Sequence, residues 1–260
     1  MKKIIAAMLA LVMVIGMTAC SSKKDDKKLI LGTSADYPPF EFIVLNDAGE
    51  KIYAGIDISL AKKLAEDAGK ELEIVNMSFD NLMASLQKGE IDIVVAAIEE
   101  DEERALVADF SDPYYTDLPP MILVRAEDTA NYTSMDSFNG KTVGAQMGTT
   151  KADIVTNDMP GATLLTVSSV TDLVNNLVYK KCDAIILDGA VAQQYANSDN
   201  TLVISEVELG VAAPYVVAVK KGDPSKLLES FNKTIAKVTT DGTMDQWIKE
   251  ADELSASAIE

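Results

Sequence analysis

Apolar positions along the chain switch between the spacing of buried strands and that of amphipathic helices. Strand-like runs lie at 29–31, 72–74, 91–98, 141–146, 163–167, 184–187 and 215–219. Helical spacing follows from Asp57 to Gly69, from Ser78 or Asp80 to Gly89, after Thr150, from Ser169 or Thr171, after Gly189, over roughly 224–239 and around Trp247. We expect Asp57 to cap the first of these helices. This alternation of strands and helices predicts an α/β protein.

The strand–helix pattern forms two series, and the segment 114–120 separates them. Two such series predict two α/β lobes. The nearly continuous apolar run 91–98 is typical of a strand covered on both faces. In open parallel sheets, ligands bind beyond the carboxyl ends of the strands. This rule directs attention to the strand ends at 34–37, 97–99, 146–150 and 188.

The first residues have the pattern of an export signal. A cationic start is followed by the apolar run 4–17, which is short for a membrane span, and then by Thr18, Ala19 and Cys20. We therefore expect residues 1–19 to be a signal peptide. The order resembles a bacterial lipobox, which implies cleavage before Cys20 and a lipid on its sulfur. The alternative is an ordinary signal peptide with a cysteine there by chance. The polar segment 20–28 is expected to be a flexible tether.

Composition excludes several classes of function. The formal net charge is −18, and removal of residues 1–19 takes away two lysines and leaves −20. Such a charge argues against nucleic acid as a partner. The chain has no histidine, which weakens readings based on a catalytic histidine or a typical zinc site. We expect no cofactor and no metal, because the sequence contains neither a phosphate-binding loop nor a metal-ligand spacing.

The second cysteine, Cys182, has no partner if Cys20 carries a lipid. It precedes an apolar strand-like run, so we expect a core or near-core thiol and not a nucleophile. The fold of the exported domain must then be stabilised by the burial of its core, without a disulfide.

Three positions at strand ends could bind charged groups. Arg104 offers a guanidinium fork that suits a carboxylate, although it could instead pair with the acidic run 99–103 on the surface. The segment 148–150 offers helix-start amides that attract anions, although Thr150 and Asp153 could form a capping pair. Asp188 could accept hydrogen bonds from an ammonium group or cap the following helix. Local sequence leaves each pair of alternatives open.

Three aromatic residues lie near the strand ends of the first series. Tyr37 and Phe79 could stack on a bound side chain. A core position is the default for a single aromatic residue, and we assign Phe40 to the core.

From about residue 29 onward, the chain resembles the polar amino-acid family of bacterial solute-binding proteins, which have the periplasmic-binding fold used by ABC importers. The matching motifs, in order, are Gly32–Phe42, Gly55–Ala61, Phe79–Leu82, Gly89–Asp92, Glu103-Arg104, Asp109–Tyr115, Gly140–Gly144, Gly148–Thr150 and Cys182–Ala184 followed by Asp188. Their order and spacing together are far more specific than any one motif.

The resemblance implies a two-lobe, type II periplasmic-binding fold. Each lobe is expected to hold a mixed, mostly parallel sheet flanked by helices. Two hinge crossings would fall near 115–119 and 212–215. Lobe 1 would then comprise residues 29–115 and 215–260, and lobe 2 residues 116–214.

The resemblance also implies a ligand site in the cleft between the lobes. In the family, an arginine and helix-start amides hold the ligand carboxylate, an aspartate and a strand-end carbonyl meet its ammonium, and two side chains sandwich it. By position, these roles fall on Arg104, on Thr149 and Thr150, on Asp188 and Ala97, and on Tyr37 and Phe79. Gln146 occupies a position that helps to select the ligand side chain.

Two positions depart from the family pattern. Glu99 stands where relatives often have threonine or serine, so a second carboxylate lies near the expected carboxylate subsite. Glu99 could turn outward, pair with Arg104 or meet a cationic end of the ligand. Ser34 replaces an aspartate that many relatives carry. The particular ligand is therefore left open.

The resemblance implies a non-enzymatic, monomeric substrate-binding component of an ABC importer, which captures a polar amino acid or a related small zwitterion by hinge closure. Its partners would be the ABC permease subunits and, through the lipid on Cys20, the outer face of the cell membrane, or the periplasm if an outer membrane is present. One alternative is a dehydratase of aromatic amino-acid synthesis, with Glu99 as the acid or base. Another is a ligand-sensing subunit for a receptor.

Overall fold

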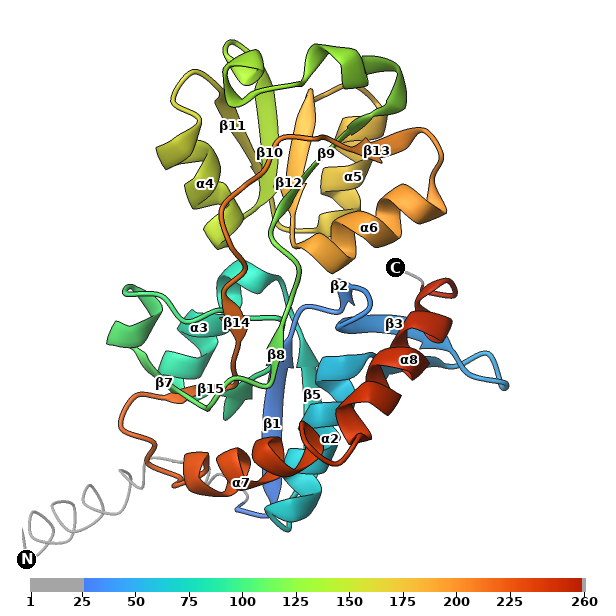
Figure 1. Ribbon diagram of the computed structural model, residues 1–260. Coiled ribbons are helices and arrows are strands. Elements are labelled where there is room, and N and C mark those ends of the chain that lie inside the picture. The colour runs from blue at the N-terminus through green and yellow to red at the C-terminus, as the bar shows by residue number, and fades with distance from the viewer. Residues whose placement is uncertain (1–25, 259–260) are drawn as a thin grey trace, which may run out of the picture.

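The computed structural model describes residues 26–258, which form two lobes, each built around its own sheet (Figure 1). The expected signal peptide 1–19 and the lipid site Cys20 lie outside the described residues. Among those that are described, no helix has the length and apolar character that a membrane crossing requires.

The first lobe holds a five-stranded mixed sheet in the order β5 (Glu71–Asn76), β1 (Lys28–Thr33), β6 (Ile93–Val94), β15 (Ala218–Lys220) and β7 (Ala108–Phe110). β1 pairs in parallel with β5 and β6, whereas β15 pairs antiparallel with β6 and β7. The helices of this lobe are α2 (Ile56–Asp67), α3 (Phe79–Lys88), α7 (Leu228–Val238) and α8 (Thr243–Ser255). Early and late parts of the chain therefore share one sheet.

The second lobe holds a five-stranded sheet in the order β11 (Thr163–Val167), β10 (Thr142–Gln146), β12 (Ala184–Leu187), β9 (Met121–Arg125) and β13 (Leu202–Ile204). β10 is parallel to β11 and β12, and β9 is antiparallel to its two neighbours. The flanking elements are α4 (Thr150–Asp158), α5 (Val170–Val178), α6 (Gly189–Ser198) and the short 3-10 helices η2 (Ala126–Asn131) and η3 (Met135–Phe138).

Two chain crossings join the lobes, and they pair with each other as β8 (Tyr115–Thr116) and β14 (Pro214–Tyr215). A small sheet of β2 (Asp36–Tyr37), β3 (Glu41–Leu45) and β4 (Lys51–Ala54) lies beside the first lobe, and the 3-10 turn η1 (Arg104–Leu106) precedes β7. The predicted two-lobe α/β fold with two hinge crossings is confirmed. The residue boundaries proposed for the lobes stay a prediction.

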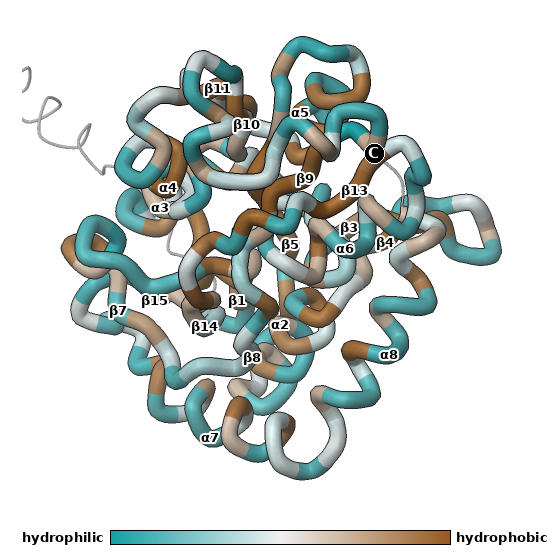
Figure 2. Tube along the Cα trace, turned by 45° about the horizontal axis from the view of Figure 1, so that its top comes forward, coloured by the Kyte–Doolittle hydropathy of each residue, from teal (hydrophilic) through white to brown (hydrophobic). Residues whose placement is uncertain are grey.

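Apolar side chains fill the interior of both lobes. In the tube coloured by hydropathy, hydrophobic residues lie along central strands such as β9 (Figure 2). Phe40 is fully buried, as expected of a core residue. Cys182 lies in the core beside the second sheet, and burial raises the pKa of its thiol to about 11. A thiol with such a pKa stays protonated at neutral pH, which fits a packing role.

The expectation that Asp57 caps a helix is wrong. Gly55 takes the cap position of α2, and Asp57 is fully buried two residues later, in the first turn of the helix. One of its oxygens accepts a hydrogen bond from the Ala97 amide at 2.6 Å, and both lie 2.8 Å from the Tyr114 hydroxyl. Burial raises the pKa of Asp57 to about 6, although these hydrogen bonds lower it.

The hydrogen bond that Ala97 donates to Asp57 also accounts for the early end of the strand predicted over 91–98. The run is largely buried, but only Ile93–Val94 pairs as β6. Ala97 has a φ of 47°, in the left-handed region that residues other than glycine seldom adopt. The buried carboxylate of Asp57 holds the Ala97 amide in this turn, and so ends the strand at the cleft.

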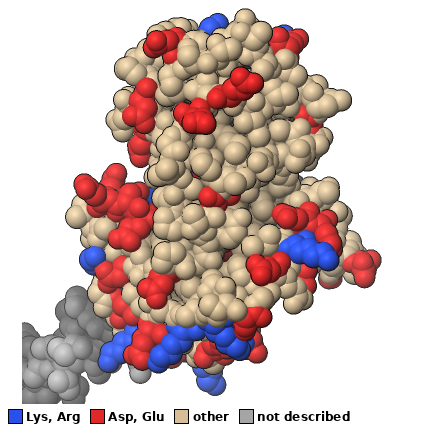
Figure 3. Space-filling model, viewed as in Figure 1, with Lys and Arg blue, Asp and Glu red and all other residues tan. Residues whose placement is uncertain are grey.

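On the face shown in Figure 3, acidic side chains are scattered over both lobes, whereas many of the basic ones lie at the base of the first lobe, over α7. This distribution agrees with the strongly negative net charge.

Candidate functional site

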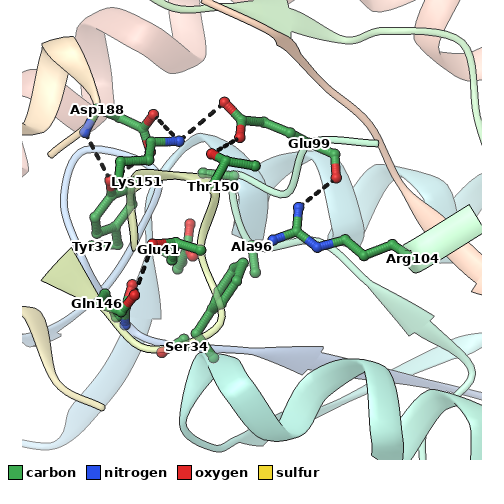
Figure 4. A pocket seen from close by; sticks show the side chains of 13 residues that line it. Ser34, Tyr37, Glu41, Ala96, Glu99, Arg104, Gln146, Thr150, Lys151 and Asp188 are labelled. Atoms are coloured by element: carbon green, nitrogen blue, oxygen red, sulfur yellow. Dashed lines mark hydrogen bonds and ion pairs between the residues drawn. The ribbon is translucent and has the colours of Figure 1, made fainter. Parts of the chain in front are cut away.

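A cavity lies between the lobes, and residues of both lobes line it (Figure 4). Small-molecule sites are often found where two domains meet. The nine predicted site residues all line it: Tyr37, Phe79, Ala97, Glu99, Arg104, Gln146, Thr149, Thr150 and Asp188. Four more residues complete the wall: Ser34, Glu41, Ala96 and Lys151. The strand-end rule therefore located the cavity, and the ligand-binding role of these residues stays a prediction.

Arg104 is buried at the edge of this cavity. Its guanidinium donates to the carbonyl of Glu99 at 2.6 Å and, across the cleft, to the carbonyl of Gly148 at 3.0 Å. It also pairs with Asp101 at 3.1 Å and lies over the Phe79 ring, 5.5 Å from the centroid. The alternative pairing with the acidic run is therefore formed through Asp101, but Arg104 is buried at the cavity and does not lie on the surface.

The turn at 148–150 brings the start of α4 to the cavity. Gly148 has a φ of 78°, and a Cβ built on it would lie 3.2 Å from the Cα of Asp80 in the first lobe, so glycine permits this close approach. The capping pair of Thr150 and Asp153 is not formed: Thr149 is the cap residue, and the Thr150 hydroxyl donates to Glu99. The amides at the helix start are therefore available to an anion.

Asp188 takes the cap position of α6 but makes no capping bond with its side chain. Its carboxylate instead accepts a 2.6 Å hydrogen bond from the Tyr37 hydroxyl of the first lobe and pairs with Lys151. Burial, and then the charge of Asp188, raise the pKa of Tyr37 well above its ordinary value, so the hydroxyl keeps its proton and donates. Two roles were left open for Asp188, a hydrogen-bond acceptor in the cleft and a helix cap. Its carboxylate faces the cleft and does not cap the helix.

Glu99 turns into the cleft and not toward solvent. One carboxylate oxygen lies 3.0 Å from the Lys151 ammonium, and the other accepts from Thr150. Its partner is therefore Lys151. The alternative of an ion pair with Arg104 is not formed, since the part of Glu99 that Arg104 contacts is the backbone carbonyl.

Glu41 is a buried carboxyl group that sequence reasoning missed. It begins β3 directly after the Pro-containing loop, is only 1 % exposed, and its Oε2 has no hydrogen-bond partner. Burial raises the pKa of Glu41 well above 4.5, and the nearby Asp57 carboxylate adds to this effect. An unpartnered buried oxygen on a cavity wall is suited to a donor that the cavity receives.

Lys151 was also missed, although its position carried a signal. It lies in the first turn of α4, where the helix dipole disfavours a cation. The position of Glu41 gave a weaker signal. It lies between two phenylalanines in a strand, and neighbouring side chains of a strand point to opposite faces. Its carboxylate must therefore face either solvent or a second buried surface. Gln146, which was predicted, donates its amide to the carbonyl of Ser168 at 3.0 Å.

The cavity does not have the chemistry of a metal site. Within residues 26–258, no cluster of three or more histidine, cysteine, aspartate or glutamate side chains is arranged to hold a metal ion. Its charged groups are two cationic side chains, Arg104 and Lys151, and three carboxyl groups, Glu41, Glu99 and Asp188. Such a set can hold a small ligand that carries both signs of charge.

Three comparisons place the chain among known proteins. Residues 29–250 match the model of the bacterial extracellular solute-binding proteins, family 3. The arginine-binding extracellular protein ArtP of Bacillus subtilis (strain 168) is 32 % identical, and the alignment covers 96 % of this chain and 98 % of ArtP.

Two solved structures are similar to the whole two-lobe fold. The amino acid ABC transporter substrate-binding protein AbpA of Streptococcus pneumoniae, bound to L-arginine, superposes with a TM-score of 0.83 at 33 % identity, covering 90 % of this chain and 97 % of AbpA. The ancestral amino acid-binding protein AncCDT-1, a precursor of cyclohexadienyl dehydratase, gives a TM-score of 0.77 at 32 % identity and covers 86 % and 95 % of the two chains. The sequence match over most of the chain, together with the shared fold, shows that the chain belongs to the bacterial extracellular solute-binding proteins of family 3.

Proposed function

We propose that the protein is the substrate-binding component of an ABC importer for a cationic amino acid, with arginine as the first candidate. The observation that carries the choice of a cationic ligand is Glu41, a buried carboxyl group on the cavity wall with an unpartnered oxygen. A guanidinium or ammonium at the end of the ligand side chain would supply the missing donors.

The two ends of the α-amino acid would then meet groups from different lobes. Arg104 of the first lobe and the start of α4 in the second would hold the carboxylate, as the positions of the family motifs imply. Asp188 of the second lobe and the carbonyl of Ala97 in the first would hold the ammonium. A zwitterion that bridges these groups stabilises the closed form relative to the open one.

The charge of the cavity supports the same ligand class. Glu99 and Asp188 balance Arg104 and Lys151, so the cavity reaches a net charge of −1 only when Glu41 ionises. The raised pKa of Glu41 favours its protonated form in the empty cavity, and a cationic ligand favours the ionised form. Arginine and lysine carry one net positive charge and would neutralise the cavity. The similarity to arginine-binding proteins agrees with this choice.

A thermal-shift screen of the mature protein against the twenty amino acids, polyamines and betaines tests the proposal. A ligand that binds only the native state raises the melting temperature. We expect arginine or lysine to give the largest shift, with calorimetry then showing one site per chain. A larger shift with a neutral amino acid would contradict the cationic assignment, and no shift with any amino acid would contradict the function.

We favour binding without turnover over the dehydratase alternative. The only cleft acid or base named from the sequence, Glu99, is held by Lys151 and Thr150 and is not poised at a free position. Incubation with prephenate or arogenate should leave both unchanged. Measurable turnover of either compound would support an enzyme.

A contact between the lobes that lies outside the ligand-binding groups joins Asp36 to the start of α5. Asp36 of the first lobe accepts a 2.7 Å hydrogen bond from the amide of Val170, at the start of α5 in the second lobe. Asp36→Ala removes this cap and should destabilise the closed form by about 1 kcal/mol, or about fivefold in ligand affinity.

The matched control is Ser134→Ala, which removes a capping contact wholly within the second lobe, where the side chain of Ser134 is part of a capping box at the start of η3. It should lower thermal stability and leave affinity unchanged. Equal affinities of Asp36→Ala and the wild type in calorimetry would show that the contact does not govern closure.

The anchor is proposed from the sequence, because Cys20 lies outside the described residues. Cys20→Ser removes the sulfur that would carry the lipid, so the protein should move from the membrane fraction to the soluble fraction on cell fractionation. Cys182→Ser, at a buried core position, is the control and should remain with the membranes. Membrane association of Cys20→Ser equal to that of the control would contradict the lipid anchor.

A further inference from the structure

Lys151 places a second cation inside the cleft. Its side chain is buried, with the residue 5 % exposed, and its ammonium contacts both Glu99 of the first lobe, at 3.0 Å, and Asp188 of its own lobe (Figure 4). A buried cation at a helix N-terminus is unfavourable unless carboxylates compensate for it. The two ion pairs therefore account for its position.

Glu99 lies at the end of the cavity where the ligand carboxylate is expected. Its backbone carbonyl accepts from Arg104, and its side chain contacts Thr150 and Lys151 beside the helix-start amides. A carboxylate at this place repels a second one unless a cation neutralises it. Arg104 does not pair with the Glu99 carboxylate in this structure and remains beside the cavity.

Lys151 is able to supply the neutralising charge. Burial by itself would lower the pKa of Lys151, but the charges of Asp188 and Glu99 outweigh burial, and its pKa is raised. The ammonium therefore stays protonated at neutral pH and lies within ion-pair distance of Glu99.

We propose that Lys151 is a specificity-determining residue, whose ammonium cancels the charge of Glu99 so that this end of the cleft accepts a carboxylate. The proposal rests on the proposed function, because it assigns a role within the same ligand site. It implies that Glu99 and Lys151 act as a pair. Without Lys151, the charge of Glu99 makes this end of the cleft favour a neutral group over an anion.

Two ligands that differ only at this end provide the test. L-arginine has a carboxylate where L-argininamide has a neutral carboxamide, and both are used at a pH at which their α-amino groups are protonated. Calorimetry on the wild type, Lys151→Met, Glu99→Gln and the double variant gives four ratios of the two affinities. Methionine is matched to lysine as an unbranched, uncharged side chain.

We expect Lys151→Met to weaken arginine binding and to leave argininamide binding equal or stronger, so that the arginine preference falls by about tenfold or more. The double variant should recover most of this preference, because neither charge is then present. Glu99→Gln alone should keep the preference for arginine. Lys151→Gln serves as a second neutral variant, and a thermal melt of each variant verifies that it is folded.

An equal loss for the two ligands in both Lys151→Met and Lys151→Gln would overturn the proposal, because a structural role moves both affinities together. A double variant with the low preference of Lys151→Met would also overturn it, since the charge of Glu99 would not be the cause. Failure of the wild type to bind any cationic amino acid would overturn the proposed function and, with it, this inference. The two failures are thus distinguishable.

Discussion

Replacing Arg104 with alanine should abolish measurable binding of arginine at ordinary protein concentrations. The guanidinium is buried between the Glu99 and Gly148 carbonyls and faces the cavity, so its loss would leave the ligand carboxylate desolvated without a partner. Removing one member of such a buried pair costs about 2 to 5 kcal/mol, or about 30-fold to several thousand-fold in affinity. Calorimetry with the mature protein measures this loss directly.

Two variants separate the binding of the ligand carboxylate from the general stability of the protein. Arg104→Lys keeps the charge but loses the two-point fork, so it should bind with intermediate affinity. The chain's other arginine, Arg125, donates to the carbonyls of Leu177 and Cys182 inside the second lobe. Arg125→Ala should therefore lower the melting temperature and leave the affinity of the folded protein unchanged.

An unchanged arginine affinity of Arg104→Ala would remove this residue from the site. A loss of equal size in Arg125→Ala would show that both variants act through folding. The expected pattern is a selective one, with affinity lost at Arg104 and stability lost at Arg125.

The sequence predicted best the strands that carry an unbroken apolar run. The predicted strand 184–187 matches β12, whose four residues are all buried inside the sheet, as a nearly continuous apolar run indicates. The predicted strand 163–167 matches β11, which lies at the edge of the sheet and is only partly buried. The antiparallel strands β9 and β13 were not predicted, since β9 lies next to the hinge crossing and β13 has only three residues. Their pairing depends on contacts between distant segments.

The site was predictable in position but not in its charge balance. The strand-end rule and the family motifs named nine residues that line one cavity. The hydrophobic periodicity of a sequence does not tell which way a single polar side chain points at the start of a strand or in the first turn of a helix. Glu41 and Lys151 were missed for this reason. Asp57 was misassigned for the same reason: a cap and a buried acceptor look alike in the sequence near a helix start.

Glu41→Gln should lower the affinity for arginine by about 100-fold, because it removes the buried charge expected to meet the guanidinium. L-citrulline is the matched ligand, since it replaces the guanidinium with a neutral urea group of similar shape. Its affinity should change little, so the variant should lose most of the wild-type preference for arginine over citrulline. Equal losses for both ligands would show that Glu41 does not recognise the side-chain charge.

The pH dependence of binding gives a second signature of Glu41. Burial raises the pKa of Glu41 well above 4.5 in the folded protein, so the empty cavity favours its protonated form. A bound guanidinium favours the ionised form, so binding should release a proton. The arginine affinity should therefore fall as pH is lowered through this pKa, whereas Glu41→Gln should show no such proton release in calorimetry across buffers of different ionisation enthalpy.

The stability of the ligand-free protein should change with pH in the opposite sense. A carboxyl group with a raised pKa in the folded state stabilises the protein fully below its ordinary pKa of 4.5, and this contribution is lost as pH rises through the folded-state value. Glutamine is neutral at every pH. The free energy of unfolding of the wild type should therefore decrease relative to Glu41→Gln as pH rises above 4.5, measured by urea denaturation without ligand. A constant difference between the two proteins across this range would mean that Glu41 titrates normally, and a cationic ligand would then gain no advantage from its burial.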